Sequence, residues 1–325
     1  MGEFDLIAKY FKRPPVAAHV ALGVGDDCAL LQPAAGMQLA ITSDMLVEGR
    51  HFLSTVDPVK LGHKSLAVNL SDLAASGARP LAFTLALSLP QVDENWLKGF
   101  SAGLFALADE HGCELIGGDT TRGPLNICIT AFGEVPRGQA LLRSGAQAGD
   151  DIYVSGTLGD ARLALEVFRG SLALPAETFT QARARLEQPS PRVALGLALR
   201  GVATAAVDVS DGLLGDLGHL LSASSCGASI HTETALQLLD MDTGPGTTSA
   251  VPEEDRLRYV LAGGDDYELA FTAPPSARQA VQAAASRSRT RVTRIGQVES
   301  APGIRLLDSE GRQRSGDFGS FDHFA

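Results

Sequence analysis

The feature that most constrains this chain is a set of aspartates that follow short apolar stretches and lie beside glycine, serine or threonine. Such segments predict strands that run into tight turns. The six positions are Asp26–Asp27, Asp44, Asp72, Asp119, Asp208 with Asp211, and Asp265–Asp266. Carboxylates on turns of small residues suit Mg²⁺, which prefers oxygen ligands and bridges one or two carboxylates to substrate phosphates. Ordinary turn chemistry explains any one of them equally well, but together they favour a magnesium and polyphosphate site.

Length and charge narrow the classes of function. The chain has 325 residues, 45% hydrophobic and 20% charged, which is typical of a globular protein of one or two domains. Its formal charge of −11 and pI near 5.1 disfavour a nucleic-acid partner, which requires basic surface. No apolar run approaches the roughly 18 residues of a membrane span, and the first residues do not resemble a signal peptide. We therefore expect a cytoplasmic protein with no membrane partner.

Strand-like apolar segments alternate with stretches of helical period, which predicts a mixed α/β (α+β) fold. The expected strands are 38–42, 83–89, 126–135, 151–155, 203–209, 267–272 and 292–298. Leucines in 61–73 and apolar residues in 96–108 recur at helical spacing, so we expect an amphipathic helix over each. Glycines cluster between residues 136 and 149, ahead of a new strand. This predicts an N-terminal domain of residues 1–137 and a C-terminal domain of residues 138–325.

The common phosphate-binding motifs are missing from the sequence. Residues 62–65 lack the order and glycine spacing of a Walker A loop, and there is no kinase or Rossmann fingerprint. Gly117–Gly118 would let the backbone before Asp119 approach a phosphate closely, and Arg143 is a candidate to stabilise its charge. Among the histidines, His51 is the best site candidate. No nucleophile and base can be paired, so phosphoryl transfer by positioning and charge neutralisation is favoured over covalent catalysis.

In its motifs the chain resembles the thiamine-monophosphate kinases, of the aminoimidazole ribonucleotide synthetase-like superfamily. The resemblance extends over essentially the whole chain, and the order and spacing of its blocks make it specific. The blocks are GVGDDCALL (23–31), ITSDMLVEGRHF (41–52), LGHKSLAVNLSDLAASGARP (61–80), LIGGDTTRGPL (115–125), RSGAQAGDDIYVSGTLGD (143–160), DVSDGLLGDLGHL (208–220), GGDDYELAF (263–271) and FDHF (321–324).

The resemblance implies an activity and an assembly. The activity is the ATP-dependent phosphorylation of thiamine monophosphate to thiamine diphosphate, by direct transfer of the γ-phosphate with several Mg²⁺ ions. The assembly is a homodimer of two-domain chains with an aminoimidazole ribonucleotide synthetase-like fold. In that fold the two N-terminal domains pair into a shared β-barrel, with ATP near the interface and an α/β domain at the C-terminus.

The resemblance also assigns roles to residues by position. The implied magnesium ligands are Asp27, Thr42, Ser43, Asp44, Asp72, Asp119, Asp208 and Asp211. The implied ATP contacts are Gly118, Asp119, Arg143 and Ser210, and catalysis would depend on Asp44, Asp72, Asp119 and Arg143. The implied contacts to thiamine monophosphate are His51, Asp265 and Phe321. Two of these depart from the commoner pattern, because Asp265 stands where relatives often carry Glu and Phe321 where many carry Tyr.

The sequence disfavours two related enzymes and leaves two other interpretations open. Selenophosphate synthetase-like enzymes carry a reactive cysteine near the N-terminus, whereas no cysteine precedes Cys28 here, and hydrogenase-maturation relatives end in a cysteine-bearing tail that this sequence lacks. Aminoimidazole ribonucleotide synthetase itself is the remaining enzymatic alternative. A non-catalytic sensor of nucleotide or metal on the same scaffold is the alternative from another class, and it would not turn over ATP.

Overall fold

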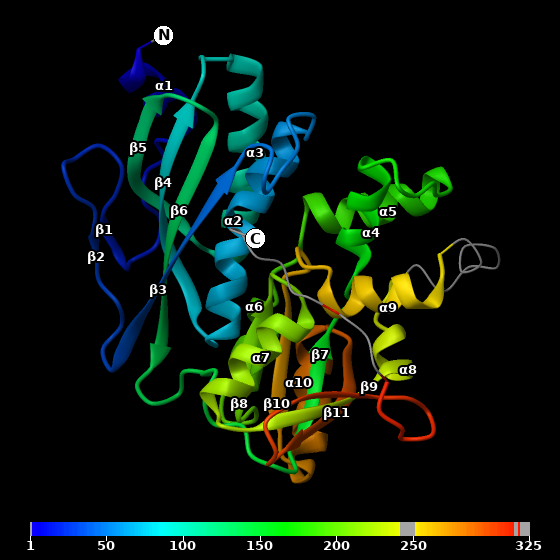
Figure 1. Ribbon diagram of the computed structural model, residues 1–325. Helices are drawn as coiled ribbons and strands as arrows, with labels where there is room; N and C mark the ends of the chain where they lie inside the picture. The colour runs from blue at the N-terminus through cyan, green and yellow to red at the C-terminus, as the bar shows by residue number, and fades with distance from the viewer. Residues whose placement is uncertain (1, 241–250, 315–317, 319–325) are drawn as a thin grey trace. The chain divides into compact units, whose positions relative to one another are not determined.

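The computed structural model describes residues 2–240, 251–314 and 318, and the chain divides into two compact units (Figure 1). Unit 1 contains residues 1–73 and 78–140, and unit 2 contains residues 74–77 and 141–325. Within the described ranges every helix is too short or too polar to cross a lipid bilayer.

Unit 1 is an open sheet covered by helices. Its elements are α1 (Glu3–Tyr10), β1 (Val20–Leu22), β2 (Leu30–Leu31), β3 (Met37–Val47), α2 (Pro58–Ala75), β4 (Arg79–Leu89), α3 (Glu94–His111), β5 (Glu114–Arg122) and β6 (Asn126–Pro136). The main sheet has the order β3-β6-β4-β5, with β3 and β5 at its two edges. β6 lies antiparallel to both β3 and β4, whereas β4 and β5 are parallel. In the described part of unit 1 this sheet does not close into a barrel.

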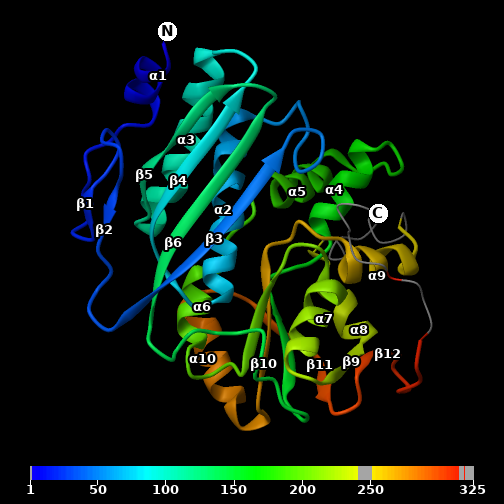
Figure 2. The ribbon, with the colours of Figure 1, turned by 60° about the vertical axis from the view of Figure 1, so that its left-hand side comes forward.

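Helices α2 and α3 cover one face of this sheet (Figure 2). Strand β4 contributes alternate leucines, including Leu85 and Leu87, to the buried layer, and α3 contributes Phe100 and Leu104. The two helices approach so closely that a Cβ added at Gly103 would lie 1.8 Å from the carbonyl oxygen of Val59. Glycine is therefore required at this crossing, which fixes the position of α2.

Unit 2 is built on a six-stranded mixed sheet of order β12-β9-β11-β7-β10-β8. Its elements are β7 (Asp151–Ser155), α4 (Asp160–Phe168), α5 (Ala176–Glu187), α6 (Val193–Leu199), β8 (Ala205–Val209), α7 (Leu213–Ala223), β9 (Gly227–His231), α8 (Thr232–Leu236), α9 (Glu253–Ala262), β10 (Glu268–Ala273), η3 (Pro275–Ala277), α10 (Arg278–Ser288), β11 (Val292–Glu299) and β12 (Gly303–Leu307). Apolar residues of α7, α8 and α9 pack on one face of the sheet, and α6 packs with α10.

The expected strands and helices are largely confirmed. One strand, β5, was not expected, and its contacts with β4 explain why it forms. The seven expected strands correspond to β3, β4, β6, β7, β8, β10 and β11, and the two expected helices are α2 and α3. β5 was not expected, because its glycines are poor strand formers. Gly118 nevertheless belongs in that strand: its φ is +144°, and a Cβ there would lie 1.8 Å from the carbonyl oxygen of Leu85 on β4.

Candidate active site

Two of the predicted carboxylates in unit 1 lie within electrostatic range of each other. Asp44 lies on β3 and Asp72 on α2, and the hydroxyl of Thr42 donates a hydrogen bond to the carboxylate of Asp72. Burial, together with the nearby negative charge of Asp72, raises the pKa of Asp44 to about 7. One carboxylate oxygen of Asp44 is buried with no hydrogen-bond partner among the described residues. A buried carboxylate left unpaired is costly, so this oxygen is placed to accept a ligand.

Ser43 lies on the other face of the sheet from Thr42 and Asp44, as the alternation of a strand requires. Its hydroxyl lies 3.0 Å from that of Thr130 and 3.7 Å from the sulfur of Cys128, both on β6. The side chain of Ser43 therefore does not join the Asp44–Asp72 pair. The exposed side chains of Leu39, Ile41 and Met45 continue the same open face along β3.

Asp119 and Gly118 lie on β5, at the opposite edge of the sheet from Asp44. The register joins Asp44 to Ile129 on β6, Ile129 to Leu85 on β4, and Leu85 to Gly118 on β5. Three strand spacings amount to about 14 Å. A single chain therefore does not bring Asp119 to the Asp44–Asp72 pair.

Asp27 and His51 lie on loops of unit 1. Asp27 is exposed between β1 and β2, where its backbone N–H donates to the carboxylate of Asp26 at 2.8 Å. His51 follows β3, and its Nδ1 accepts the backbone N–H of Val47 at 3.0 Å. In the neutral ring the proton must then lie on Nε2. His51 therefore presents a hydrogen-bond donor rather than a base.

In unit 2 the DVSDG segment forms a loop between β8 and α7. Asp208 is buried near the end of β8, and Ser210 and Asp211 follow it. The carboxylate of Asp216, on α7, accepts the backbone N–H groups of Ser210 and Asp211, each at 3.0 Å. Asp216 was not among the predicted residues. Its position five residues after Asp211 was the available signal, but only the folded turn shows that it organises the loop.

Burial raises the pKa of Asp216 to about 6. The charge of Asp211 adds to this rise, whereas the two backbone N–H groups and the cation of Arg143 oppose it. Arg143 is exposed, and its carbonyl oxygen accepts the hydroxyl of Ser224 at the far end of α7. Arg143 is thus within electrostatic range of the Ser210–Asp211 loop.

Asp265 belongs to a backbone turn that is joined to the same loop. Asp265 and Tyr267 have φ of 60° and 52°, in the left-handed region that costs non-glycine residues energy. Their N–H groups donate to the carbonyl oxygens of Ser210 and Val209, each at 2.8 Å. The tyrosine hydroxyl lies 3.3 Å from the carboxylate of Asp265.

A buried ion cluster follows this turn. Glu268 is fully buried and accepts hydrogen bonds from Arg185 at 2.7 Å, Arg192 at 2.6 and 2.5 Å, and Ser155 at 2.5 Å. A cluster in which one acid is shared by two cations holds its residues in one arrangement. Glu268 is the first residue of β10, so the cluster anchors the strained turn that carries Asp265.

The structure corrects one part of the sequence prediction. Asp44 lies within β3, Asp119 within β5, Asp208 within β8 and Asp72 within α2, so these four are not on turns. The turn prediction holds for Asp26–Asp27, for Asp211 and for Asp265.

Phe321 lies outside the described residues. Among those that are described, no three carboxylate, histidine or cysteine side chains converge as a metal site.

Sequence comparisons define the class to which this fold and these residues belong. The profile of AIR synthase related protein, N-terminal domain, matches residues 25–135, and that of its C-terminal domain matches residues 147–309. The class is therefore that of the AIR synthase related proteins.

Individual relatives give a narrower assignment. The chain is 46% identical to the thiamine-monophosphate kinase of Salmonella typhimurium over 330 residues, covering 100% of this chain and 98% of the relative. It is 43% identical to the enzyme of the same name from Haemophilus influenzae, with the same coverage. The chain belongs to the thiamine-monophosphate kinase family.

Solved structures agree with this. The thiamine-monophosphate kinase of Stenotrophomonas maltophilia superposes with a TM-score of 0.82 at 48% identity, covering 89% of this chain and 91% of that one. AaThiL complexed with AMPPCP and TMP superposes with a TM-score of 0.73 at 28% identity, covering 90% and 89%. Escherichia coli HypE, a hydrogenase maturation protein, has a TM-score of 0.76 at only 22% identity, so it shares the fold alone.

Proposed function

We propose that this protein is a thiamine-monophosphate kinase, which transfers the γ-phosphate of ATP to thiamine monophosphate and releases thiamine diphosphate and ADP. The observation that carries the proposal is the end-to-end similarity, at 46% identity, to a kinase of that name. The complex of AaThiL with AMPPCP and TMP supports the choice of both substrates, because it holds an ATP analogue together with TMP.

The chemistry of the acceptor matches the side chains that the site offers. A phosphate monoester is largely ionised at neutral pH, since its second pKa is about 6. Its oxygen can attack the γ-phosphorus directly while the bond between that phosphorus and the β,γ-bridging oxygen breaks and the electron pair leaves with ADP. No side chain has to remove a proton. His51, with the proton on Nε2, is placed to orient the acceptor by donating a hydrogen bond.

The residues around Asp44 fit magnesium. Asp44 and Asp72 offer two neighbouring carboxylates, Thr42 adds a hydroxyl, and one oxygen of Asp44 lacks a partner among the described residues. Mg²⁺ commonly uses one or two carboxylates and completes its shell with substrate phosphates and water. When bound, the ion neutralises charge that develops on the transferred phosphoryl group. We assign Asp27 to the same role as a magnesium ligand. For Ser43 we assign the backbone, rather than the side chain, to magnesium.

In unit 2 we assign Asp208 and Asp211 to magnesium and Ser210 and Arg143 to ATP. Their support is the loop that Asp216 orders by accepting the N–H groups of Ser210 and Asp211, in which Asp211 stays partly exposed. Asp265 is assigned to thiamine monophosphate, on the turn held by the Glu268 cluster. Phe321 is assigned to the same substrate from sequence alone.

The protein acts as a homodimer in this proposal. On the open face of unit 1, Leu39, Ile41 and Met45 are 43%, 61% and 54% exposed. A second copy covering this face would bury them and complete a β-barrel from two open sheets. It would also supply Gly118 and Asp119, which lie across the sheet from Asp44 within one chain. The reaction belongs to the cytoplasm, where ATP is supplied.

Release of ADP tests whether this chain is an enzyme or a sensor. The purified protein is incubated with Mg·ATP, with and without thiamine monophosphate. The proposal expects ADP to form only when thiamine monophosphate is present. Binding of ATP without any turnover in either case would instead favour the non-catalytic sensor.

A further inference from the structure

Three neighbouring carboxylates are buried in unit 2. Asp160, the first residue of α4, and Asp266 are each 1% exposed, and Glu268 is fully buried. Glu268 is paired with Arg185 and Arg192, whose side chains are themselves mostly buried. With all three acids ionised, this group would carry three negative charges and two positive ones. An uncompensated charge in a protein interior is costly, and retention of one proton by the acids removes it.

Asp160 lacks the hydrogen bonds that normally hold a buried carboxylate. Neither of its oxygens has a hydrogen-bond partner of normal geometry among the described residues. Burial raises the pKa of Asp160 to about 6, although the hydroxyl of Thr157 and the cation of Arg185 oppose the rise. A buried oxygen without a donor is placed to accept one, and a protonated carboxyl group is such a donor.

Asp266 is tied to the start of α4, beside Asp160. Both oxygens of Asp266 accept the backbone N–H of Gly159, at 3.0 and 3.1 Å, and Gly159 directly precedes Asp160. Burial, followed by the charge of Asp160, raises the pKa of Asp266 well above its ordinary value of 3.8. When two acids interact in this way, the proton belongs to the pair rather than to either residue.

The pair is connected to the turn that carries Asp265. Asp266 lies between Asp265 and Tyr267, which have φ of 60° and 52°. Backbone in this left-handed region persists only where surrounding contacts hold it. The bonds from Gly159 to Asp266 are among these contacts, so a change in the charge of Asp266 acts directly on the turn.

We propose that Asp160 and Asp266 together hold one proton at neutral pH, and that this proton keeps the turn that carries Asp265 in place. The second part rests on the proposed function, which assigns Asp265 to thiamine monophosphate. Loss of the proton would leave two neighbouring negative charges in a buried site. One carboxylate would then have to turn toward water, and the turn would move with it. The other charged groups that act on the pair are Arg185 from α5, Glu268 from β10 with its second partner Arg192, and Asp240 after α8.

Asparagine is the test substitution, because it has the shape of the acid and no charge. Asp160→Asn and Asp266→Asn are compared with the wild type by urea unfolding at pH 7 and pH 3. A proton that the folded state keeps and the unfolded state releases lowers stability, increasingly so as the pH rises above the ordinary pKa of 3.8. We expect the unfolding constant of each variant to be at least about tenfold smaller than that of the wild type at pH 7, and within about twofold of it at pH 3.

Kinetics test the position of Asp265. In the wild type, KM for thiamine monophosphate should rise at least about threefold between pH 7 and pH 9, as the pair loses its proton. In Asp160→Asn the two charges cannot oppose each other, so this KM should change less than about twofold over the same range. The pH dependence of kcat should be the same in both proteins, because neither acid of the pair contacts the reacting groups.

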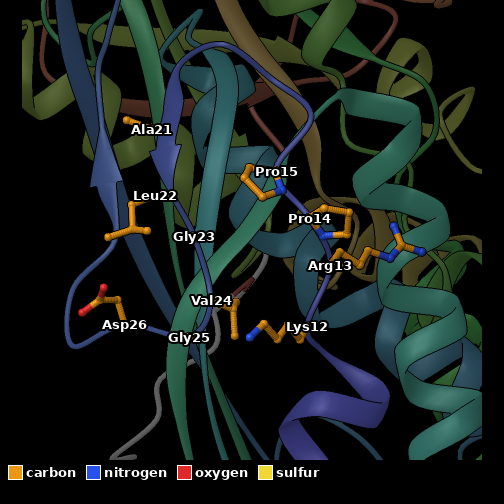
Figure 3. Close-up of a pocket in the computed structure, with 10 residues that line it drawn as sticks. All are labelled: Lys12, Arg13, Pro14, Pro15, Ala21, Leu22, Gly23, Val24, Gly25 and Asp26. Atoms are coloured by element: carbon orange, nitrogen blue, oxygen red, sulfur yellow. The ribbon is translucent and has the colours of Figure 1, made fainter.

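Asp26→Asn is the matched control for stability. Asp26 and Asp27 are also neighbouring carboxylates, but both are exposed, and Asp26 is among the residues that line a pocket of unit 1 (Figure 3). Water screens exposed charges, so Asp26→Asn should unfold like the wild type at both pH values.

The inference is overturned if neither Asp160→Asn nor Asp266→Asn is more stable than the wild type at pH 7, which includes failure of both to fold. A gain of the same size at pH 3, or an equal rise in KM at pH 9 in the wild type and in Asp160→Asn, would overturn it as well. If the wild type makes no thiamine diphosphate, the proposed function falls, whereas the unfolding measurements still decide whether the pair holds a proton.

Discussion

Asp44 on β3 and Asp72 on α2 are electrostatically coupled, and burial of Asp44 together with the charge of Asp72 raises the pKa of Asp44 to about 7. The helix that carries Asp72 packs closely on α3 at Gly62 and Gly103, where a side chain would strike backbone. Burying a charged carboxylate such as that of Asp44 costs free energy, so packing alone does not explain why it is there. Such a cost is common where residues are kept for binding or catalysis.

The first prediction concerns this pair. Asp44→Asn keeps the shape of the side chain but replaces a carboxylate with an amide, which is a poorer magnesium ligand. We expect kcat at limiting Mg²⁺ to fall by at least about 100-fold, with an unchanged circular dichroism spectrum. Asp255→Asn, at a partly exposed position on α9 where Asp255 pairs with Arg258, is the control and should keep the wild-type rate. Near wild-type turnover by Asp44→Asn would show that Asp44 does not hold the metal.

A second prediction concerns the acceptor. Free thiamine presents a hydroxyl whose proton has to be removed, whereas thiamine monophosphate presents an ionised phosphate. His51 accepts a backbone N–H at Nδ1 and is therefore not arranged as a base. We expect kcat/KM for thiamine to be at least about 100-fold below that for thiamine monophosphate. Comparable values for the two acceptors would contradict the assigned role of His51.

The third prediction tests the homodimer. Light scattering at micromolar concentration should give twice the 33.9 kDa mass of one chain. Ile41→Lys places a charge on the open face of the unit 1 sheet and should shift the mass toward that of the monomer, because a buried charge opposes association. Val92→Lys changes a similarly exposed apolar residue on the loop before α3 and should leave the mass unchanged. A monomeric wild type would exclude the shared barrel and the supply of Asp119 by a second copy.

A fourth prediction concerns the pH dependence of stability in unit 2. The carboxylate of Asp151 is buried and accepts hydrogen bonds from Arg278 at 2.6 Å and Arg294 at 3.1 Å. The bond from Arg278 is the main reason that the pKa of Asp151 lies below its ordinary value of 3.8. The stabilisation is therefore complete above that value and is lost as the pH falls through it to the lower pKa of the folded state.

Asp151→Asn should lower the free energy of unfolding by about 1–2 kcal/mol at pH 7, a modest value because both arginines are half-exposed. Urea unfolding at pH 7 and pH 3 should show the difference shrinking at the lower pH. A difference that is equal at both pH values would mean that packing, not charge, accounts for the loss.

The sequence predicts this fold where side-chain periodicity is strong. The leucines of 61–73 predicted α2, and the apolar alternation of 126–135 predicted β6, because these patterns reflect burial directly. Asp44 and Asp72 were expected on turns because local residue preferences say nothing of a partner strand. β6 pairs with β3 along all of Met37–Val47, which keeps Asp44 within a strand.

Candidate site residues could be named from the sequence only where a motif specifies them. The DVSDG and GGDDYEL blocks led to Ser210, Asp211 and Asp265. A backbone hydrogen bond joins Asp265 to Ser210, and the N–H of Asp211 donates to the carboxylate of Asp216. Asp216 and Glu268 were missed because their contacts are set by the fold: Asp216 reaches back across a turn, and the partners of Glu268 are distant in the sequence. The distance of Asp119 from Asp44 likewise follows from strand order, which no local pattern encodes.

Identification of the phosphorylated product is the decisive test of the proposed kinase activity. Purified protein is incubated with Mg·ATP, carrying radiolabel in the γ-phosphate, and thiamine monophosphate, and the products are separated by chromatography. We expect labelled thiamine diphosphate in an amount equal to the ADP released, and none with Asp72→Asn. Release of ADP with labelled free phosphate and no thiamine diphosphate would contradict it.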